Sequence, residues 1–158
     1  IFISFFLFDF VKPSFDNCQP WKLKKRVLPQ HTDHAGVMWH GSYSLWLEEA
    51  RIEILSMVGL DYFDLSCNGI EMPVLSLQIN YKNSLFHGDV VVLENWFSTL
   101  RGVKLVCKSN FIKSSNIIAA EATIELVFVS KHKTGFNIIR KPPEFINNAL
   151  DTMKFGPS

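Results

Sequence analysis

Residues 28–51 of the chain carry the sequence LPQHTDHAGVMWHGSYSLWLEEAR. Three histidines, an aspartate and a glycine crowd a short polar segment, and an apolar helical pattern follows directly. From Ser42 to Val58 apolar side chains recur at helical spacing, which predicts a helix, and Gly59 is placed to end it in a left-handed turn. The apolar face is wide, so we expect this helix to be largely enclosed by other structure.

Alternating strand patterns surround the helix. They cover residues 22–28, 72–83, 89–100, 103–113 and 116–130. The third and fourth of these strands, joined through Arg101-Gly102, predict a hairpin, and residues 142–150 predict a short terminal helix. A long apolar helix followed by an antiparallel meander must pack on one face of the sheet, which gives an α+β fold. Apolar residues also occur on the opposite face of the strands, which predicts an oligomer.

The composition favours one folded domain. The chain has 158 residues, 47% of them hydrophobic and 20% charged, with a net charge of +1. So small a net charge creates no field that would gather nucleic acid or an acidic membrane. Cys18, Cys67 and Cys107 lie far apart without a CxxC motif. This pattern disfavours a disulfide framework or a four-cysteine zinc site, favours a reducing, cytoplasmic compartment, and predicts three buried thiols.

The N-terminal sequence IFISFFLFDFV is dense in phenylalanine. Asp9 interrupts it far short of the roughly 20 apolar residues that span a bilayer, so no membrane span is expected. We expect an added strand or a segment packed on a partner subunit, with contact to a membrane surface as an alternative. The chain then divides into an N-terminal extension at 1–20, a main domain at 21–141, and a tail with a possible short helix at 142–158.

The polar segment before the helix supports several chemistries. Its three histidines, with Asp33, are suitable metal donors, but their spacing matches no compact template such as HExxH. Ser42 and Ser44 flank His40 as candidate nucleophiles. However, no GxSxG turn is present, and Ser42 lies where a helix start recruits a capping serine.

A carboxylate mechanism is the third chemistry. Asp33, in a tight turn beside the helix, can attack an acyl carbon or draw a proton from water. The first amides of the helix lack intrahelical partners and can stabilise a developing oxyanion. Gly36 permits a sharp turn and Gly41 permits a substrate to approach the backbone. These features predict an acyl-transfer site without a metal, while a purely structural role for Asp33 and Gly36 stays open.

The stretch HTDHAGVMWHGSYSLWLEEAR resembles the signature of the hotdog-fold acyl-CoA thioesterases of the 4-hydroxybenzoyl-CoA thioesterase type. The matching residues, in order and spacing, are Asp33, Gly36, Val37, His40, Tyr43, Glu49, Ala50 and Arg51. The strand, helix and meander from about Trp21 to Arg140 agree with the same fold. The resemblance implies a long central helix packed against an antiparallel β-sheet.

The resemblance also implies roles for individual residues. Asp33 would be the catalytic carboxylate, as nucleophile or as general base on water. The backbone amide of His40 would polarise the thioester carbonyl, and its imidazole would form a wall of the pocket. The substrate would also meet Gly41, Tyr43, Trp39 and Glu48, the last of these against a ring hydroxyl. The chain departs from the family at His31, where many members have a second aspartate.

No metal and no cofactor are implied, because coenzyme A is part of the substrate. The resemblance implies a homodimer or homotetramer with its sites at subunit interfaces. Basic side chains at the pocket mouth usually meet the phosphates of coenzyme A. The candidates are Lys82, Arg101, Lys104, Lys131, Lys133, Arg140 and Lys141.

Within the family, the sequence most resembles the cyanobacterial and plastid-related branch that hydrolyses 1,4-dihydroxy-2-naphthoyl-CoA in phylloquinone biosynthesis. Aromatic side chains at Trp39, Tyr43 and Trp46 are compatible with a bicyclic ring. Three alternatives stay open. They are a general fatty acyl-CoA thioesterase, a dehydratase that uses His31 or His40 with Glu48, and a non-catalytic acyl-CoA-binding protein.

Overall fold

The computed structural model describes residues 18–100 and 103–157. The strands are β1 (Trp21–Arg26), β2 (Ile70–Glu71), β3 (Val74–Tyr81), β4 (Val90–Leu100), β5 (Lys104–Lys113), β6 (Ile117–Val127), β7 (Val129–His132) and β8 (Gly135–Ile138). The α-helices are α1 (His40–Met57), α2 (Tyr62–Cys67) and α3 (Glu144–Phe155), and short 3-10 turns span Pro29–His31 and Ser114–Asn116.

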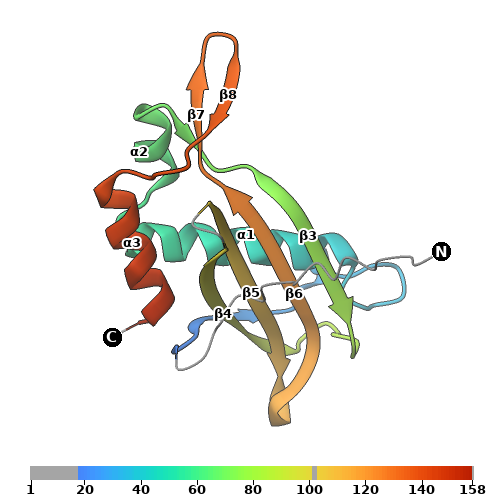
Figure 1. Cartoon of the computed structure of the whole chain (residues 1–158). Helices are drawn as coiled ribbons and strands as arrows, with labels where there is room; N and C mark the ends of the chain where they lie inside the picture. The colour runs from blue at the N-terminus through green and yellow to red at the C-terminus, as the bar shows by residue number, and fades with distance from the viewer. Residues whose placement is uncertain (1–17, 101–102, 158) are drawn as a thin grey trace, which may run out of the picture.

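A five-stranded antiparallel sheet in the order β1-β4-β5-β6-β3 is crossed on one face by α1 (Figure 1). A smaller sheet, β2-β7-β8, projects at the end of the molecule near α2. The expected α+β arrangement is therefore present, and β4 and β5 pair as the sequence predicts. None of the described helices is long and apolar enough to cross a membrane.

Helix α1 packs on the sheet because one of its faces is apolar along its whole length. Tyr43, Leu47 and Ile54 are buried in the core together with inward residues of the central strands. The helix begins two residues earlier than expected, and Gly59 adopts the predicted left-handed conformation, with φ of +78°. The expectation of an enclosed helix is only partly met. Leu45 and Ile52, on the face away from the sheet, are 57% and 44% exposed.

The outer face of the sheet is more polar than the sequence suggests. Ion pairs join lysines and glutamates there: Lys22 to Glu94 at 2.9 Å, Lys82 to Glu121 at 2.7 Å, and Lys104 to Glu125 at 2.7 Å. Exposed apolar side chains do occur along the edge strand β3, where Leu75 and Leu77 are 52% and 44% exposed.

Two elements differ from the sequence prediction. The expected strand at 116–130 breaks at Phe128, whose side chain is buried and whose carbonyl accepts a hydrogen bond from the amide of Ile139. The chain then forms the β7–β8 hairpin, which periodicity alone did not reveal. The terminal helix is longer than expected. It buries Ile146 and Met153 in the core, and the Met153 carbonyl accepts a hydrogen bond from the Trp21 indole at 2.9 Å.

The thiols are only partly buried as predicted. Cys107 is buried, Cys18 is half-buried and Cys67 is exposed. The predictions for the phenylalanine-rich N-terminus fall outside the described residues.

The buried thiol of Cys107 makes the free energy of unfolding depend on pH in the alkaline range. Burial raises the pKa of this thiol to about 11, although a contact with the Ser109 hydroxyl opposes the rise. The folded state holds the thiol proton more tightly than the unfolded state does. The contribution of the thiol to the free energy of unfolding is therefore complete below the unfolded-state pKa and is lost as pH rises through the folded-state pKa. We expect Cys107→Ala to unfold more easily at pH 8 but to lose less stability between about pH 9 and pH 11.

Urea unfolding at a series of pH values measures the slope of the free energy of unfolding against pH. The exposed thiol of Cys67 provides the matched control, and Cys67→Ala should keep the slope of the parent protein. Identical slopes for Cys107→Ala and the parent would contradict the assignment.

Candidate active site

The polar segment ahead of α1 forms a small hairpin. Thr32 pairs with Met38, and the amide of Asp33 donates to the carbonyl of Val37 at 2.9 Å. Gly36 occupies the tip with φ of +75°, a conformation that favours glycine, so its predicted turn role is confirmed. Val37 bridges onward to Phe86, which attaches the hairpin to the segment between β3 and β4.

The carboxylate of Asp33 is oriented through one of its two oxygens. Oδ1 accepts hydrogen bonds from the amides of Ala35 at 2.8 Å and Val37 at 3.3 Å. Within residues 18–100 and 103–157, no hydrogen bond or ion pair uses Oδ2 of this exposed side chain. Oδ1 therefore fixes the orientation of the carboxylate, and Oδ2 is available to a bound molecule.

The start of α1 follows the hairpin directly. Trp39 is the residue before the first helical turn, and its carbonyl accepts from the amide of Ser42 at 3.0 Å. In the described part of the chain, the amides of His40 and Gly41 have no hydrogen-bond acceptor. The Trp39 indole lies over Gly41, where any β-carbon would collide with its ring. A β-carbon at this position would therefore force the indole, which is 39% exposed, to move away.

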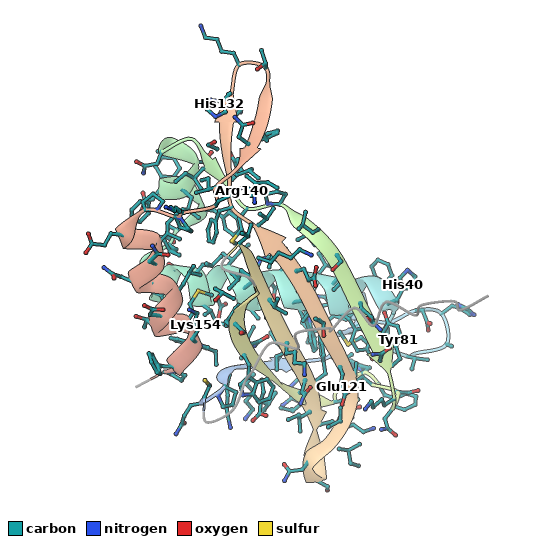
Figure 2. All side chains as sticks on the ribbon, in the orientation of Figure 1. His40, Tyr81, Glu121, His132, Arg140 and Lys154 are labelled. Carbon is teal, nitrogen blue, oxygen red and sulfur yellow. The ribbon has the colours of Figure 1, made fainter. Side chains whose placement is uncertain are left out.

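A cavity of about 330 Å³ adjoins the helix start. Its lining residues are Val37, Met38, His40, Tyr43, Tyr81, Lys82, Asn83 and Ser84. Figure 2 shows His40 and Tyr81 at the same end of the molecule, where α1 begins and β3 ends.

The phenol of Tyr43 is a neutral wall of this cavity. Its ring packs edge-on against Tyr81 at 5.0 Å and tilted against Phe111 at 5.1 Å. Burial, and to a smaller extent Tyr81, raises the pKa of Tyr43 to about 12. The hydroxyl therefore stays protonated at neutral pH, as a hydrogen-bond donor or acceptor without charge.

The structure brings together only some of the predicted site residues. His40, Tyr43 and Lys82 line the cavity. Asp33 lies on the hairpin that contributes Val37 and Met38 to the lining, but in the single chain Asp33 is not itself a lining residue. Trp39 and Gly41 are beside the cavity at the helix start, also outside its lining.

Glu48 lies further along α1, away from the cavity lining. Its carboxylate pairs with the buried guanidinium of Arg51, and the Nε of Arg51 donates to the hydroxyl of Tyr62 at 3.1 Å. Burial raises the pKa of Tyr62, and the arginine opposes this rise. The carboxylate of Glu48 is thus already engaged in a local network.

The alternative chemistries have less structural support. Among the described residues, no three histidine, cysteine or acidic side chains are arranged to hold a metal ion. The hydroxyl of Ser42 is buried and donates to the carbonyl of His31 at 3.1 Å, so it serves the backbone. A carboxylate mechanism is therefore the best match to the geometry.

The predicted phosphate-binding residues are scattered. Lys82 alone among the described candidates lines the cavity, and it also pairs with Glu121. Lys104 is paired on the outer sheet face, and Arg140 lies near the β7–β8 hairpin, far from His40 in Figure 2. Arg101 falls outside the described residues.

Sequence reasoning missed Tyr81, Asn83 and Ser84 as cavity residues. They follow His40 by some forty positions and reach it through the pairing of β3 with β6 and the bridge of Val37 to Phe86. The end of the alternating pattern at Tyr81 is the signal that could have placed them at a strand terminus.

Comparison with known proteins fits this site. A sequence model described as the Thioesterase-like superfamily matches residues 27–150. The chain therefore belongs to the Thioesterase-like superfamily and is a hotdog-fold thioester hydrolase. Among its relatives is the Synechocystis sp. (strain ATCC 27184 / PCC 6803 / Kazusa) protein sll0410, provisionally named an esterase. It is 36% identical over 133 residues, which are 82% of this chain and 78% of that protein.

Two solved structures extend the comparison. A DHNA-CoA thioesterase from Staphylococcus aureus has a TM-score of 0.72 at 26% identity, covering 82% of this chain and 87% of its own. Slr0204, a 1,4-dihydroxy-2-naphthoyl-CoA thioesterase from Synechocystis, has a TM-score of 0.74 at 17% identity. The match covers 84% of this chain and 96% of Slr0204. The second likeness shows the fold alone. These matches support the broad thioesterase prediction, and the narrower cyanobacterial branch stays a proposal.

The contact between Trp39 and Gly41 can be tested by a double-mutant cycle. We expect Gly41→Ala to push the indole off the helix start and to lower the free energy of unfolding by about 1–3 kcal/mol. In a Trp39→Ala background the same change should cost nothing, because the obstructing ring is gone and alanine favours the helix. Urea unfolding gives the four energies. An equal cost in both backgrounds would rule out the contact.

Proposed function

We propose that the chain is an acyl-CoA thioesterase in which Asp33 is the catalytic carboxylate. The observation that carries the proposal is the pairing of an oriented carboxylate, with one free oxygen, and a helix start whose first two amides lack acceptors in the described chain. The family membership and the CoA thioesterases with the same fold support it.

The carboxylate can act in two ways. As a general base, Asp33 takes a proton from water while the water oxygen attacks the carbonyl carbon. As a nucleophile, its oxygen forms an anhydride with the acyl group, which water then hydrolyses. In both routes the carbon–sulfur bond breaks and coenzyme A leaves as a thiol after taking up a proton. The amides of His40 and Gly41 stabilise the oxygen that becomes negative.

The site is completed by a second copy of the chain in this proposal. β3 and β1 are the two edges of the main sheet. Edge strands are usually protected from pairing by lysine, and β1 carries Lys22, Lys24, Lys25 and Arg26. β3 carries no charged residue and is mostly exposed. Two β3 edges can therefore pair antiparallel and form a homodimer, from which a homotetramer could be built.

Such pairing has a consequence for the substrate site. It sets the Tyr81 end of one β3 beside the Val74 end of the other. At the Val74 end of each chain lies an apolar cavity of about 380 Å³ lined by Tyr62, Glu71, Met72, Pro73, Val129 and Phe136. In the dimer this cavity would adjoin the His40–Tyr81 cavity and enclose the side of the site on which Asp33 lies.

We further propose an aryl-CoA thioester as substrate, with 1,4-dihydroxy-2-naphthoyl-CoA as the best candidate. The rings of Tyr43 and Tyr81 at the cavity wall and the Staphylococcus aureus likeness support this choice. A fatty acyl-CoA substrate is the alternative, since sll0410 is the nearer Synechocystis relative of the two compared and its name specifies no acyl group. The thiols of Cys67 and Cys107, which form no disulfide in the described chain, fit a cytoplasmic location.

Replacement of the carboxylate tests the catalytic role. Asp33→Asn keeps an oxygen for the amides of Ala35 and Val37 but removes the charge. We expect kcat for thiol release to fall roughly 100- to 10,000-fold. Panels of aryl-CoA and fatty acyl-CoA thioesters, followed with a thiol reagent, measure this and rank the substrates. Asp64→Asn, in the exposed face of α2, is the matched control. Equal rates for Asp33→Asn and the parent would end the assignment.

Replacement on the edge strand tests assembly. Leu77→Asp places a charge on the exposed apolar edge, and Gln78→Asp places the same charge on the neighbouring position, which faces the other way. We expect Leu77→Asp to sediment as a monomer and to lose activity, and Gln78→Asp to behave like the parent. A parent protein that is monomeric at micromolar concentration would contradict the dimer.

A further inference from the structure

We propose that His31 is the positioning residue of the Asp33 hairpin and that it acts only while its Nδ1 is unprotonated. This inference rests on the proposed function, because the hairpin matters for catalysis only if Asp33 is the catalytic carboxylate. It concerns the position at which the chain departs from the family signature.

The side chain and backbone of His31 close the turn that ends β1. The amide of His31 donates to the carbonyl of Leu28 at 2.9 Å, and the amide of Leu28 donates back to Nδ1 of His31 at 3.1 Å. This reciprocal pair holds His31 against the end of the strand. Asp33 lies only two residues further on, so the same pair fixes where the hairpin begins.

The carbonyl of His31 connects this turn to the helix. It accepts from the amide of Trp39 at 3.0 Å and from the hydroxyl of Ser42 at 3.1 Å. His31 therefore contacts both sides of the proposed catalytic arrangement, the hairpin that carries Asp33 and the first turn of α1. His31 thus links the strand end, the hairpin and the helix start through hydrogen bonds of its own.

The ring of His31 is held from the core side. It meets the buried indole of Trp46 edge-to-face, with 5.2 Å between centroids and 87° between planes. The charged groups around this pair are Lys25 of β1, whose Nζ lies 5.7 Å from the Trp46 ring centroid, Glu49 of α1, which pairs with Lys25, and Asp33 of the hairpin itself.

Protonation would break this arrangement. An imidazolium donates from both nitrogens, so a protonated Nδ1 would face the Leu28 amide donor to donor. The turn would then open and the hairpin would lose its anchor. Among side chains, imidazole is the one that gains a proton most readily as pH falls through the neutral range. We therefore expect kcat to fall on the acid side through loss of this anchor, with KM nearly unchanged.

Three variants separate this role from a general structural one. His31→Asn keeps an acceptor near the position of Nδ1 and cannot titrate. His31→Gln moves the acceptor one bond further out, toward the position of Nε2. His34→Asn removes an exposed neighbouring histidine and is the control. His40 is present in all three variants and in the parent, so it cannot cause a difference among them.

Two measurements are made on each protein between about pH 5 and 8. Amide hydrogen exchange at Leu28 and Trp39 reports the hairpin anchor without any substrate. We compare protection factors, the ratio of the intrinsic to the observed exchange rate, because the intrinsic rate itself falls with pH. In the parent and in His34→Asn we expect the protection factors of these two amides to fall roughly tenfold on the acid side. They should stay high at all pH values in His31→Asn and be low at all of them in His31→Gln.

Thiol release reports catalysis. We expect the parent and His34→Asn to share an acid limb that His31→Asn lacks, and His31→Gln to lose roughly 10- to 100-fold in kcat at every pH. Parent-like kcat and exchange in His31→Gln, or an acid limb retained by His31→Asn, would overturn the proposal. No thiol release from the parent would instead refute the thioesterase function, and the exchange data would still decide whether His31 anchors the hairpin.

Discussion

The burial of one face of α1 against the five-stranded sheet is the constraint on which the rest of the structure depends. Tyr43, Leu47 and Ile54 fix the helix against the sheet, so its first turn has one possible position relative to the strands. That position brings His40 to the end of β3, and the hairpin of Asp33 is attached to the same place by its bridge to Phe86. The relative position of Asp33 and the start of α1 in the proposed site thus follows from the packing of the core.

Much of the fold was predictable because its signals are local. Helical spacing located α1 to within two residues, and the alternation of residues 89–113 revealed the β4–β5 hairpin. The break at Phe128 was not predictable, because a continuous apolar pattern looks the same whether the strand runs on or turns away. The short helix α2 was missed for a related reason, since six residues are too few to show a period.

The candidate site was predictable in its motif but not in its surroundings. The positions of Asp33, Gly36 and His40 follow from a contiguous stretch of sequence, and the structure sets them in one hairpin and the helix turn after it. Tyr81 and Ser84 enter through strand pairing over a long sequence distance, which no local pattern encodes. The family position of Glu48 suggested a ligand contact, which stays a prediction. The structure adds that Arg51, three residues away, pairs with its carboxylate.

The unequal edges of the sheet limit how many copies can join. β1 carries a row of cations, and β3 presents leucines to solvent. If both edge strands could pair with another copy, head-to-tail addition could continue without end and produce fibres. In the proposed dimer, two copies that pair through β3 would leave only the basic β1 edges exposed. The four basic residues on this short strand would then disfavour the addition of further copies.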